Sequence, residues 1–260
     1  DCYTTTNNIY SLWLAREHLT EDIILLEADV FFERLLLDHI FSNENKSVAA
    51  VACHQSWMSG AVVSLDKEGN IQTLFEMRHQ DAQFDYSKVF KTLNIYLFRG
   101  DFLRDQFIPS LEAFINAGDV NQYYEAILHK ITHNQQHSIT ALLCDDIKWF
   151  EIDDERDRLA AEYIFASPEE RYEVVTREHG SYWRYGFTDH AYLYNLYFPP
   201  EGVFVHIRDH VYDLLESYPM GQDALANLMS IIINQPAQQI IVGNGASELI
   251  KIISRHLSNQ

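Results

Sequence analysis

Carboxylates follow two apolar runs, at positions where they could hold a magnesium ion. Asp29 lies just after the apolar run 22–26, and Asp153 and Asp154 follow the run 148–152. In open α/β sheets, residues at strand ends border the ligand-binding crevice. Mg²⁺ prefers oxygen ligands and usually takes one or two carboxylates, with water and substrate phosphates in its other positions. These acids are therefore candidate metal ligands, although the spacing alone favours helix capping by Asp153 or Asp154.

Two further patterns could carry chemistry, and each has a simpler explanation. Gly245, Ala246 and Ser247 lie at a predicted strand-to-helix turn, where backbone N–H groups can face an anion. Glycines at such turns also serve close packing alone. His129 and His133 have helical i, i+4 spacing but lack the HExxH glutamate, so a solvated helix face explains the pair better than a metal site.

Hydrophobic periodicity predicts the elements that position these residues. We expect strands over 22–26, 47–53, 61–65, 71–76, 89–98, 138–143, 148–152 and 239–242. We expect helices over 7–19, 31–41, 102–117, 122–133, 155–165, 203–216 and 222–233, and another after residue 243. Because strands and helices interleave, the pattern predicts an α/β fold with a Rossmann-like mixed sheet flanked by helices.

Composition and charge limit the possible partners. The chain has 260 residues, 47% of them hydrophobic, which is enough for a buried core and excludes a disordered protein. A net charge of -19 would repel a phosphate backbone, so we expect no nucleic-acid partner. No apolar run approaches the roughly 20 residues that span a bilayer. The three cysteines form no CxxC motif, and a reduced, cytoplasmic setting is expected.

Six sequence blocks occur in the order found in one enzyme family. They are residues 5–12, 25–29, 57–58, 91–96, 121–125 and 149–154. With these blocks, residues 3–165 resemble the nucleotidyltransferases related to phosphocholine cytidylyltransferase and the 2-aminoethylphosphonate cytidylyltransferases. The resemblance implies that a phosphate or phosphonate oxygen attacks the α-phosphorus of CTP, with pyrophosphate leaving. A non-catalytic acidic binding module and a sugar-phosphate nucleotidyltransferase are the alternatives.

The same resemblance assigns roles to individual residues. It implies that Asp29 and Asp153, with Asp154 beside them, hold Mg²⁺, and that Lys91 directs positive charge toward phosphoryl oxygens. The substrate-binding candidates are Asn8, Tyr10, Trp57, Asn94, Tyr123 and Glu125. Trp57, Tyr123 and Tyr124 could form an aromatic wall for an ammonium head group by cation–π attraction.

The sequence departs from this family in two places. Ser59 and Ala61 stand where the family usually has an acid and a threonine, so a carboxylate that could neutralise a substrate amine is absent there. The family's domain also opens with a Gly-rich, basic phosphate loop, whereas the first glycine here is Gly60. We therefore expect residues 1–166 to be a nucleotidyltransferase domain that is incomplete at its N-terminus, and this chain alone to be inactive.

A second resemblance covers residues 179–257. The blocks 179–185, 194–200 and 218–219, with the turn at 243–247, resemble the opening of fold-type I aminotransferases. The resemblance implies that Gly245, Ala246 and Ser247 contact the phosphate of pyridoxal phosphate in a longer protein, which would be a homodimer. The aldimine-forming lysine lies farther along in that family, and Lys251 does not match it. We thus expect a linker over 167–178 and an aminotransferase segment over 179–260, with the two enzymes sharing an aminophosphonate metabolite.

Overall fold

The computed structural model divides the chain into two compact units, Asp1–Asp189 and His190–Gln260. It describes residues 4–43, 46–81, 83–134, 139–177, 190, 195 and 197–258. Within the segment 167–178, predicted as a linker, the structure has helix α7 (Pro168–Arg177), which packs on α6 (Glu155–Phe165) and buries Val174. Most of the aromatic blocks 179–185 and 194–200 lies outside the described residues.

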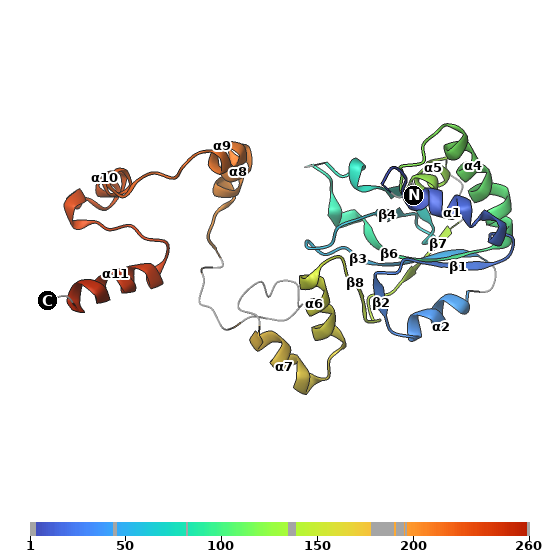
Figure 1. The fold of residues 1–260 in the computed structure, drawn as a ribbon, viewed down its shortest axis with the longest axis horizontal. Coiled ribbons are helices and arrows are strands. Elements are labelled where there is room, and N and C mark those ends of the chain that lie inside the picture. Colours follow the sequence, from blue (N-terminus) through green and yellow to red (C-terminus); the bar gives the residue numbers. More distant parts are fainter. Residues whose placement is uncertain are drawn as a thin grey trace. The chain divides into compact units, whose positions relative to one another are not determined.

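Unit 1 is built on a six-stranded mixed sheet, as the interleaved pattern predicts (Figure 1). The strands are β1 (Ile23–Leu26), β3 (Ser47–Cys53), β4 (Val62–Leu65), β5 (Ile71–Phe75), β6 (Phe90–Phe98) and β7 (Ile139–Leu143). Their order is β5-β4-β6-β3-β7, and β1 also pairs with β6. Only the β3–β7 pair of this sheet is parallel among the described strands. The sheet thus gathers the ends of strands that are far apart in the sequence.

Helices cover both faces of this sheet. Figure 1 shows α1 (Asn8–Leu14), α4 (Ile108–Asn116) and α5 (Glu125–His133) on one side and α2 (Leu35–Phe41) on the other. The alternation of side chains along β3 explains the two layers: Ala49 and Val51 join the core under α1, α4 and α5, whereas Val48 and Ala50 join the core over α2. The shorter helical segments are η1 (Arg16–His18), η2 (Met77–His79), η3 (Tyr86–Lys88), α3 (Gly100–Phe102) and η4 (Leu103–Phe107).

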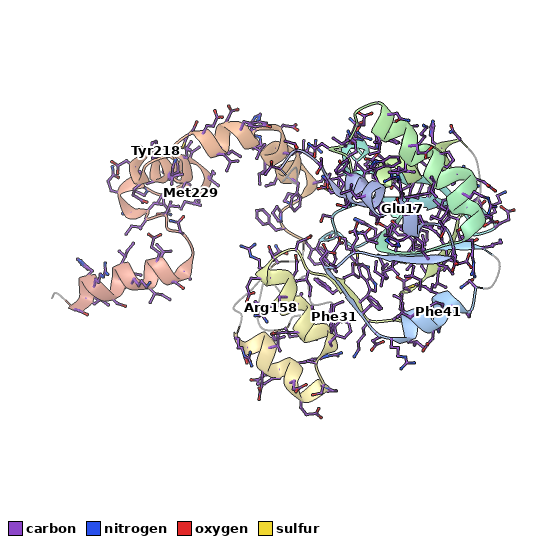
Figure 2. The ribbon with its side chains drawn as sticks, turned by 45° about the vertical axis from the view of Figure 1, so that its right-hand side comes forward. Glu17, Phe31, Phe41, Arg158, Tyr218 and Met229 are labelled. Atoms are coloured by element: carbon purple, nitrogen blue, oxygen red, sulfur yellow. The ribbon has the colours of Figure 1, made fainter. Side chains whose placement is uncertain are left out.

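A second, two-stranded sheet corrects the sequence prediction for residues 31–41. Strand β2 (Val30–Phe32) pairs antiparallel with β8 (Trp149–Glu151), and helix α2 begins only at Leu35. The backbone of β2 forms hydrogen bonds with β8, which is distant in the sequence. This tertiary pairing overrides the local helical pattern, and periodicity within one segment cannot show it. Phe31 lies beside α6 and packs edge-on against Phe165, with ring centroids 4.6 Å apart (Figure 2).

Unit 2 contains helices but no strand among its described residues. The helices are α8 (Glu201–Asp209), α9 (Val211–Glu216), α10 (Gln222–Ile233), η6 (Ala237–Gln239) and α11 (Ala246–Ser258). The strand predicted over 239–242 does not form, because this part of the unit offers no partner strand. Instead, Ile240 O and Val242 N bond to the side chain of Gln222. The unit buries little apolar surface; Figure 2 labels Tyr218, in the connection between α9 and α10, and Met229 of α10.

Two observations bear on the expected setting. Among the described residues, no helix has the length and apolar character needed to cross a membrane. Cys53 is an exposed free thiol and Cys144 a buried one. Neither forms a disulfide in the described structure.

The exposed apolar side chains of unit 2 should bind a hydrophobic dye. Leu215 and Ile231 are each 79% exposed, and several other large apolar side chains of the unit are exposed as well. We predict that anilinonaphthalene sulfonate fluoresces in the presence of the chain, and that Leu215→Glu with Ile231→Glu lowers the signal. Leu14→Glu, at an exposed site in unit 1, is the control. A chain that leaves the dye dark would contradict this expectation and favour a self-sufficient module.

Candidate active site

An acidic cavity lies in unit 1 where several strands end. Its volume is about 770 Å³. The carboxylates that line it are Glu27, Asp29, Glu76, Glu125, Glu151 and Asp153. Arg78 is the one cationic side chain among the lining residues. A polyphosphate could enter such a site only with cations that offset this negative charge.

Asp29 and Asp153 are brought together by the β2–β8 ladder. Asp29 precedes β2, Asp153 follows β8, and Ile152 N donates to Asp29 O at 2.9 Å. Both side chains line the acidic cavity. Burial, followed by the charges of Asp157 and Asp29, raises the pKa of Asp153. Two carboxylates from adjacent antiparallel segments are a ligand set that fits Mg²⁺.

Asp154, the third acid predicted to bind metal, caps a helix instead. Its Oδ1 accepts from Arg156 N at 2.7 Å and from Asp157 N at 3.0 Å, at the start of α6. Asp157 in turn accepts from Asp154 N at 3.2 Å, which completes a capping box. The structure thus gives Asp154 the capping role that its spacing favours, and its role as a metal ligand stays a prediction from the sequence resemblance.

Lys91 is a buried cation close to Asp153, one of the two candidate metal ligands. Its side chain is only 1% exposed, and its Nζ is 3.0 Å from Glu151 Oε2. Asn94 Nδ2 donates to the other oxygen of Glu151 at 3.0 Å, and Asn94 Oδ1 accepts from Thr92 Oγ1 at 3.0 Å. Lys91 and Asp153 also line a smaller cavity of about 80 Å³. Lys91 thus brings a buried positive charge to the same acids that line the larger cavity.

Special backbone conformations produce this arrangement. Asn94 has a left-handed φ of 56° in the middle of β6, where the register against β3 shifts between Ala49 and Val51. Strict alternation would place Lys91 and Asn94 on opposite faces, but the irregularity lets both reach Glu151. Gly60 has φ +97°, and a Cβ there would lie 2.9 Å from Lys91 Nζ. Another residue at position 60 would strain the backbone, and its Cβ would force the Lys91 ammonium group to shift.

The predicted aromatic wall does not form. Tyr123 lines the acidic cavity, but Trp57 lines the smaller one, where it stacks on Phe150 at 5.0 Å. Tyr124 is buried in the core, and Tyr10 lines neither cavity. These side chains come from different parts of the fold. Their positions in the sequence blocks do not determine where each ring points.

Asn8 lines the acidic cavity and also holds two helices together. Its Oδ1 accepts from Tyr124 N at 2.8 Å, next to the start of α5. Three further acids of the cavity, Glu27, Glu76 and Glu151, were not among the site residues predicted from the sequence. Each is an acid at or beside the C-terminal end of a strand, which is the signal that could have identified them.

Glu125 is the most perturbed carboxylate of the cavity. Burial raises its pKa to about 7, and Glu27 contributes in the same direction. Glu125 Oε2 is buried without a hydrogen-bond partner among the described residues. Burial likewise raises the pKa of Glu27. A cation that enters beside these two acids would relieve an unfavourable burial.

The raised pKa of Glu125 predicts a pH-dependent stability. Because the folded protein holds this proton more tightly than the unfolded chain, stability from this group is full below about pH 4.5 and is lost as the pH rises through about 7. We predict that Glu125→Gln increases the free energy of unfolding at pH 8 by on the order of 3 kcal/mol. Urea titrations between pH 4.5 and 8 measure this difference.

The control for this comparison is Glu112→Gln, which changes an exposed carboxylate of α4. It should leave the pH profile unchanged, because water solvates that charge in both states. A gain in the free energy of unfolding from Glu125→Gln that is the same at every pH would contradict the raised pKa of Glu125.

The turn before α11 is only in part as predicted. Gly245 has φ +82°, and the helix begins at Ala246 with Ser247 in its first turn. However, Asn244 N donates to Glu248 Oε2 at 2.6 Å. The backbone amide of this loop is therefore already hydrogen-bonded to a carboxylate of α11. A phosphate bound at this amide would have to displace that carboxylate. Pyridoxal phosphate and a homodimer through this segment stay predictions from the sequence resemblance.

The chain is similar in sequence to two bacterial proteins. No family model matches the chain. CMP-5'-(3-aminopropyl)phosphonate synthase of Streptomyces rubellomurinus is 35% identical over 256 residues, which cover 98% of the chain and 41% of that relative. An uncharacterized protein of Sinorhizobium fredii is 31% identical over 123 residues, 47% of the chain and 20% of that relative. The chain therefore spans well under half the length of these relatives.

One solved structure extends the likeness to the fold. CTP:phosphocholine cytidylyltransferase of Streptococcus pneumoniae superposes with a TM-score of 0.52 at 15% identity, over 64% of this chain and 67% of that one. This similarity covers the fold alone. The chain thus contains a mixed α/β fold of the nucleotidyltransferase type, and its sequence is similar to that of a CMP-phosphonate synthase.

Proposed function

We propose that unit 1 serves in magnesium-dependent cytidylyl transfer from CTP to a small phosphonate or phosphate with a cationic nitrogen, such as the amine of 2-aminoethylphosphonate or the trimethylammonium group of phosphocholine. The observation that carries this proposal is the pair Asp29 and Asp153, which line one cavity; Lys91 lines the smaller cavity together with Asp153. The 35% identity with CMP-5'-(3-aminopropyl)phosphonate synthase supports the nucleotide and the acceptor class.

The proposed reaction is a displacement at phosphorus. An oxygen of the acceptor phosphonate or phosphate forms a bond to the α-phosphorus of CTP. The bond between that phosphorus and the oxygen bridging to the β-phosphate breaks, and its electron pair leaves with pyrophosphate. A bound Mg²⁺ would supply charge compensation for the phosphoryl oxygens.

The residues of unit 1 would position the reactants and balance their charge. Asp29 and Asp153 would hold the metal ion. Lys91 would place its ammonium group near the α-phosphoryl oxygens, where negative charge accumulates. The Asn94–Glu151 hydrogen bond fixes the carboxylate that accompanies Lys91, so that the ammonium keeps its position without substrate.

Glu125 supports an acceptor with an amine. Glu125 would take the place of the carboxylate that the related enzymes have at the position of Ser59, because Ser59 and Glu125 line the same cavity. The buried, unpartnered Oε2 of Glu125 could accept from an ammonium group. Ammonium binding would lower the pKa of Glu125 and recover the free energy that burial of this acid costs.

The first test compares two adjacent acids in the whole natural protein. We predict that Asp153→Asn lowers the rate of pyrophosphate release from CTP by about 100-fold or more, the range for loss of one electrostatic stabiliser. Asp154→Asn is the matched control and should change the rate by less than about twofold, because Asn also caps helices well. Equal rates for both variants and the unchanged protein would overturn the metal assignment. UTP and dTTP in place of CTP test the sugar-nucleotide alternative.

A second test addresses the acceptor. We predict that Glu125→Gln raises KM for 3-aminopropylphosphonate by about tenfold, because the ammonium loses a charged partner worth about 1.5 kcal/mol. Propylphosphonate lacks the amine, and its KM should respond little to the same substitution. If KM rises by the same factor for both acceptors, Glu125 supports the cavity wall and does not recognise the amine.

A further inference from the structure

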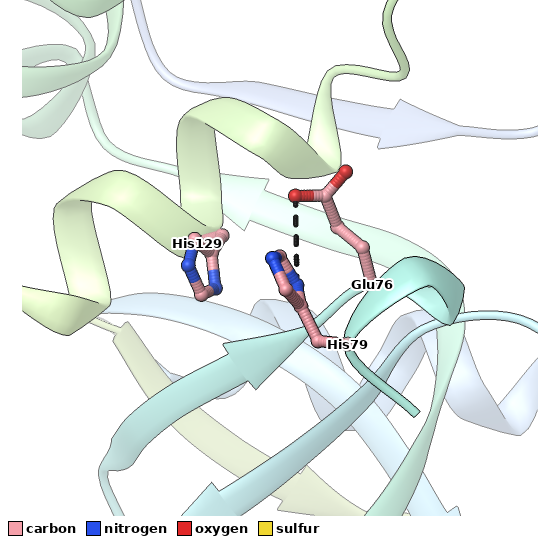
Figure 3. A group of neighbouring side chains, drawn as sticks. All are labelled: Glu76, His79 and His129. Carbon is pink, nitrogen blue, oxygen red and sulfur yellow. Dashed lines mark ion pairs between the residues drawn. The ribbon is translucent and has the colours of Figure 1, made fainter. Parts of the chain in front are cut away.

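Two histidines and a glutamate meet beside the acidic cavity. Glu76 follows β5, His79 ends η2, and His129 lies in the second turn of α5 (Figure 3). One nitrogen or oxygen atom from each side chain lies within 4.8 Å of the others. His79 Nδ1 is 3.9 Å from Glu76 Oε1, and the two imidazole rings face each other at 4.4 Å. Three potential ligands thus converge from two segments that are far apart in the sequence, 76–79 and α5.

We propose that Glu76, His79 and His129 bind a divalent transition-metal ion of the Zn²⁺ type, at a site separate from Asp29 and Asp153. Two imidazoles and one carboxylate suit Zn²⁺ and its neighbours in the first transition series. Mg²⁺ prefers a set made only of oxygen ligands, so the two sites select different ions.

The surroundings of the ligands favour this assignment. His129 Nδ1 lies 2.5 Å from Leu74 O. A carbonyl oxygen only accepts, so Nδ1 carries the hydrogen and Nε2 keeps its lone pair for a metal ion. A histidine ligand in proteins usually donates its second N–H in this way, which fixes the ring and its tautomer.

The carboxylate is also oriented by a neighbour. Arg78 Nη2 donates to Glu76 Oε1 at 2.8 Å, and Glu76 is only 7% exposed. Because zinc–nitrogen bonds are about 2.0–2.1 Å long, the three ligand atoms must come closer together to bind one ion. His79 lies on the exposed turn η2 and can approach by rotation of its side chain.

A metal ion here would connect the end of β5 to α5. Glu76 lines the acidic cavity, and α5 begins with Glu125, which lines it as well. An ion held by three protein ligands would fix this part of the cavity wall. It would also leave a coordination position for water or another small ligand, as in zinc sites with three protein ligands.

Cobalt binding tests this proposal, because Co²⁺ in a site of low coordination number absorbs visible light. We expect the EDTA-treated chain to bind one equivalent of Co²⁺ with a visible band, and Zn²⁺ to displace it. His79→Asn and His129→Asn should each weaken binding by at least about 100-fold, since even the loss of an outer hydrogen-bond partner costs about 10–100-fold. Circular dichroism would establish that each variant is folded.

His133 provides the matched control. It lies one turn beyond His129 on α5, and the two rings are 5.7 Å apart, but it is outside the three-residue cluster. His133→Asn should bind Co²⁺ like the unchanged chain. Binding that survives both His79→Asn and His129→Asn, or that is lost equally in His133→Asn, would overturn the site. Absence of any Co²⁺ band in the unchanged chain would do so too.

The readout does not depend on the proposed transferase activity. Asp153→Asn should leave Co²⁺ binding at the histidine cluster intact, while His79→Asn should leave the Asp29–Asp153 pair in place. A failure of cytidylyl transfer and a failure of the histidine site are therefore separate outcomes.

Discussion

The three-residue ladder between β2 and β8 is the constraint on which the candidate active site depends. Val30 lies opposite Glu151, so Asp29 and Asp153 emerge at the same end of the ladder. Glu151 and Asp153 are two residues apart and both face the cavity, whereas the intervening Ile152 packs with the small core around Phe150. Through Glu151, the ladder is also joined to Lys91 and Asn94 of the large sheet.

The second constraint on the site is its excess of negative charge. Six carboxylates line a cavity in which Arg78 is the single lining cation, and Lys91 approaches from behind. Such a cavity is unfavourable for these acids when it is empty, as the raised pKa values of Glu27 and Glu125 reflect. A metal ion and a substrate amine would both reduce this repulsion, so the same acids that destabilise the free protein would favour cationic ligands.

Helix α5 links the two proposed sites. Glu125 is its first residue and His129 lies four residues later, so both occupy the same face of the helix. Leu74 and Glu76 of the neighbouring chain segment meet this face, one through its carbonyl oxygen and one through its carboxylate. An ion bound by the histidine cluster would therefore act on the position of the wall that carries Glu125.

The sequence by itself determined most strands and helices of unit 1, including the strands on either side of the turn at 66–70, because local periodicity is a property of neighbouring positions. Asp66 Oδ1, for example, accepts from Asn70 N at 2.8 Å within that turn. The sequence also made Asp29 and Asp153 candidate metal ligands, since each lies in a sequence block just after an apolar run. Only the tertiary structure decided that residues 30–32 form a strand, that Asp154 caps a helix, and that Glu76 meets His129. Those outcomes depend on which distant segments become neighbours and on the direction of each side chain, and a one-dimensional pattern of apolar and polar residues contains neither.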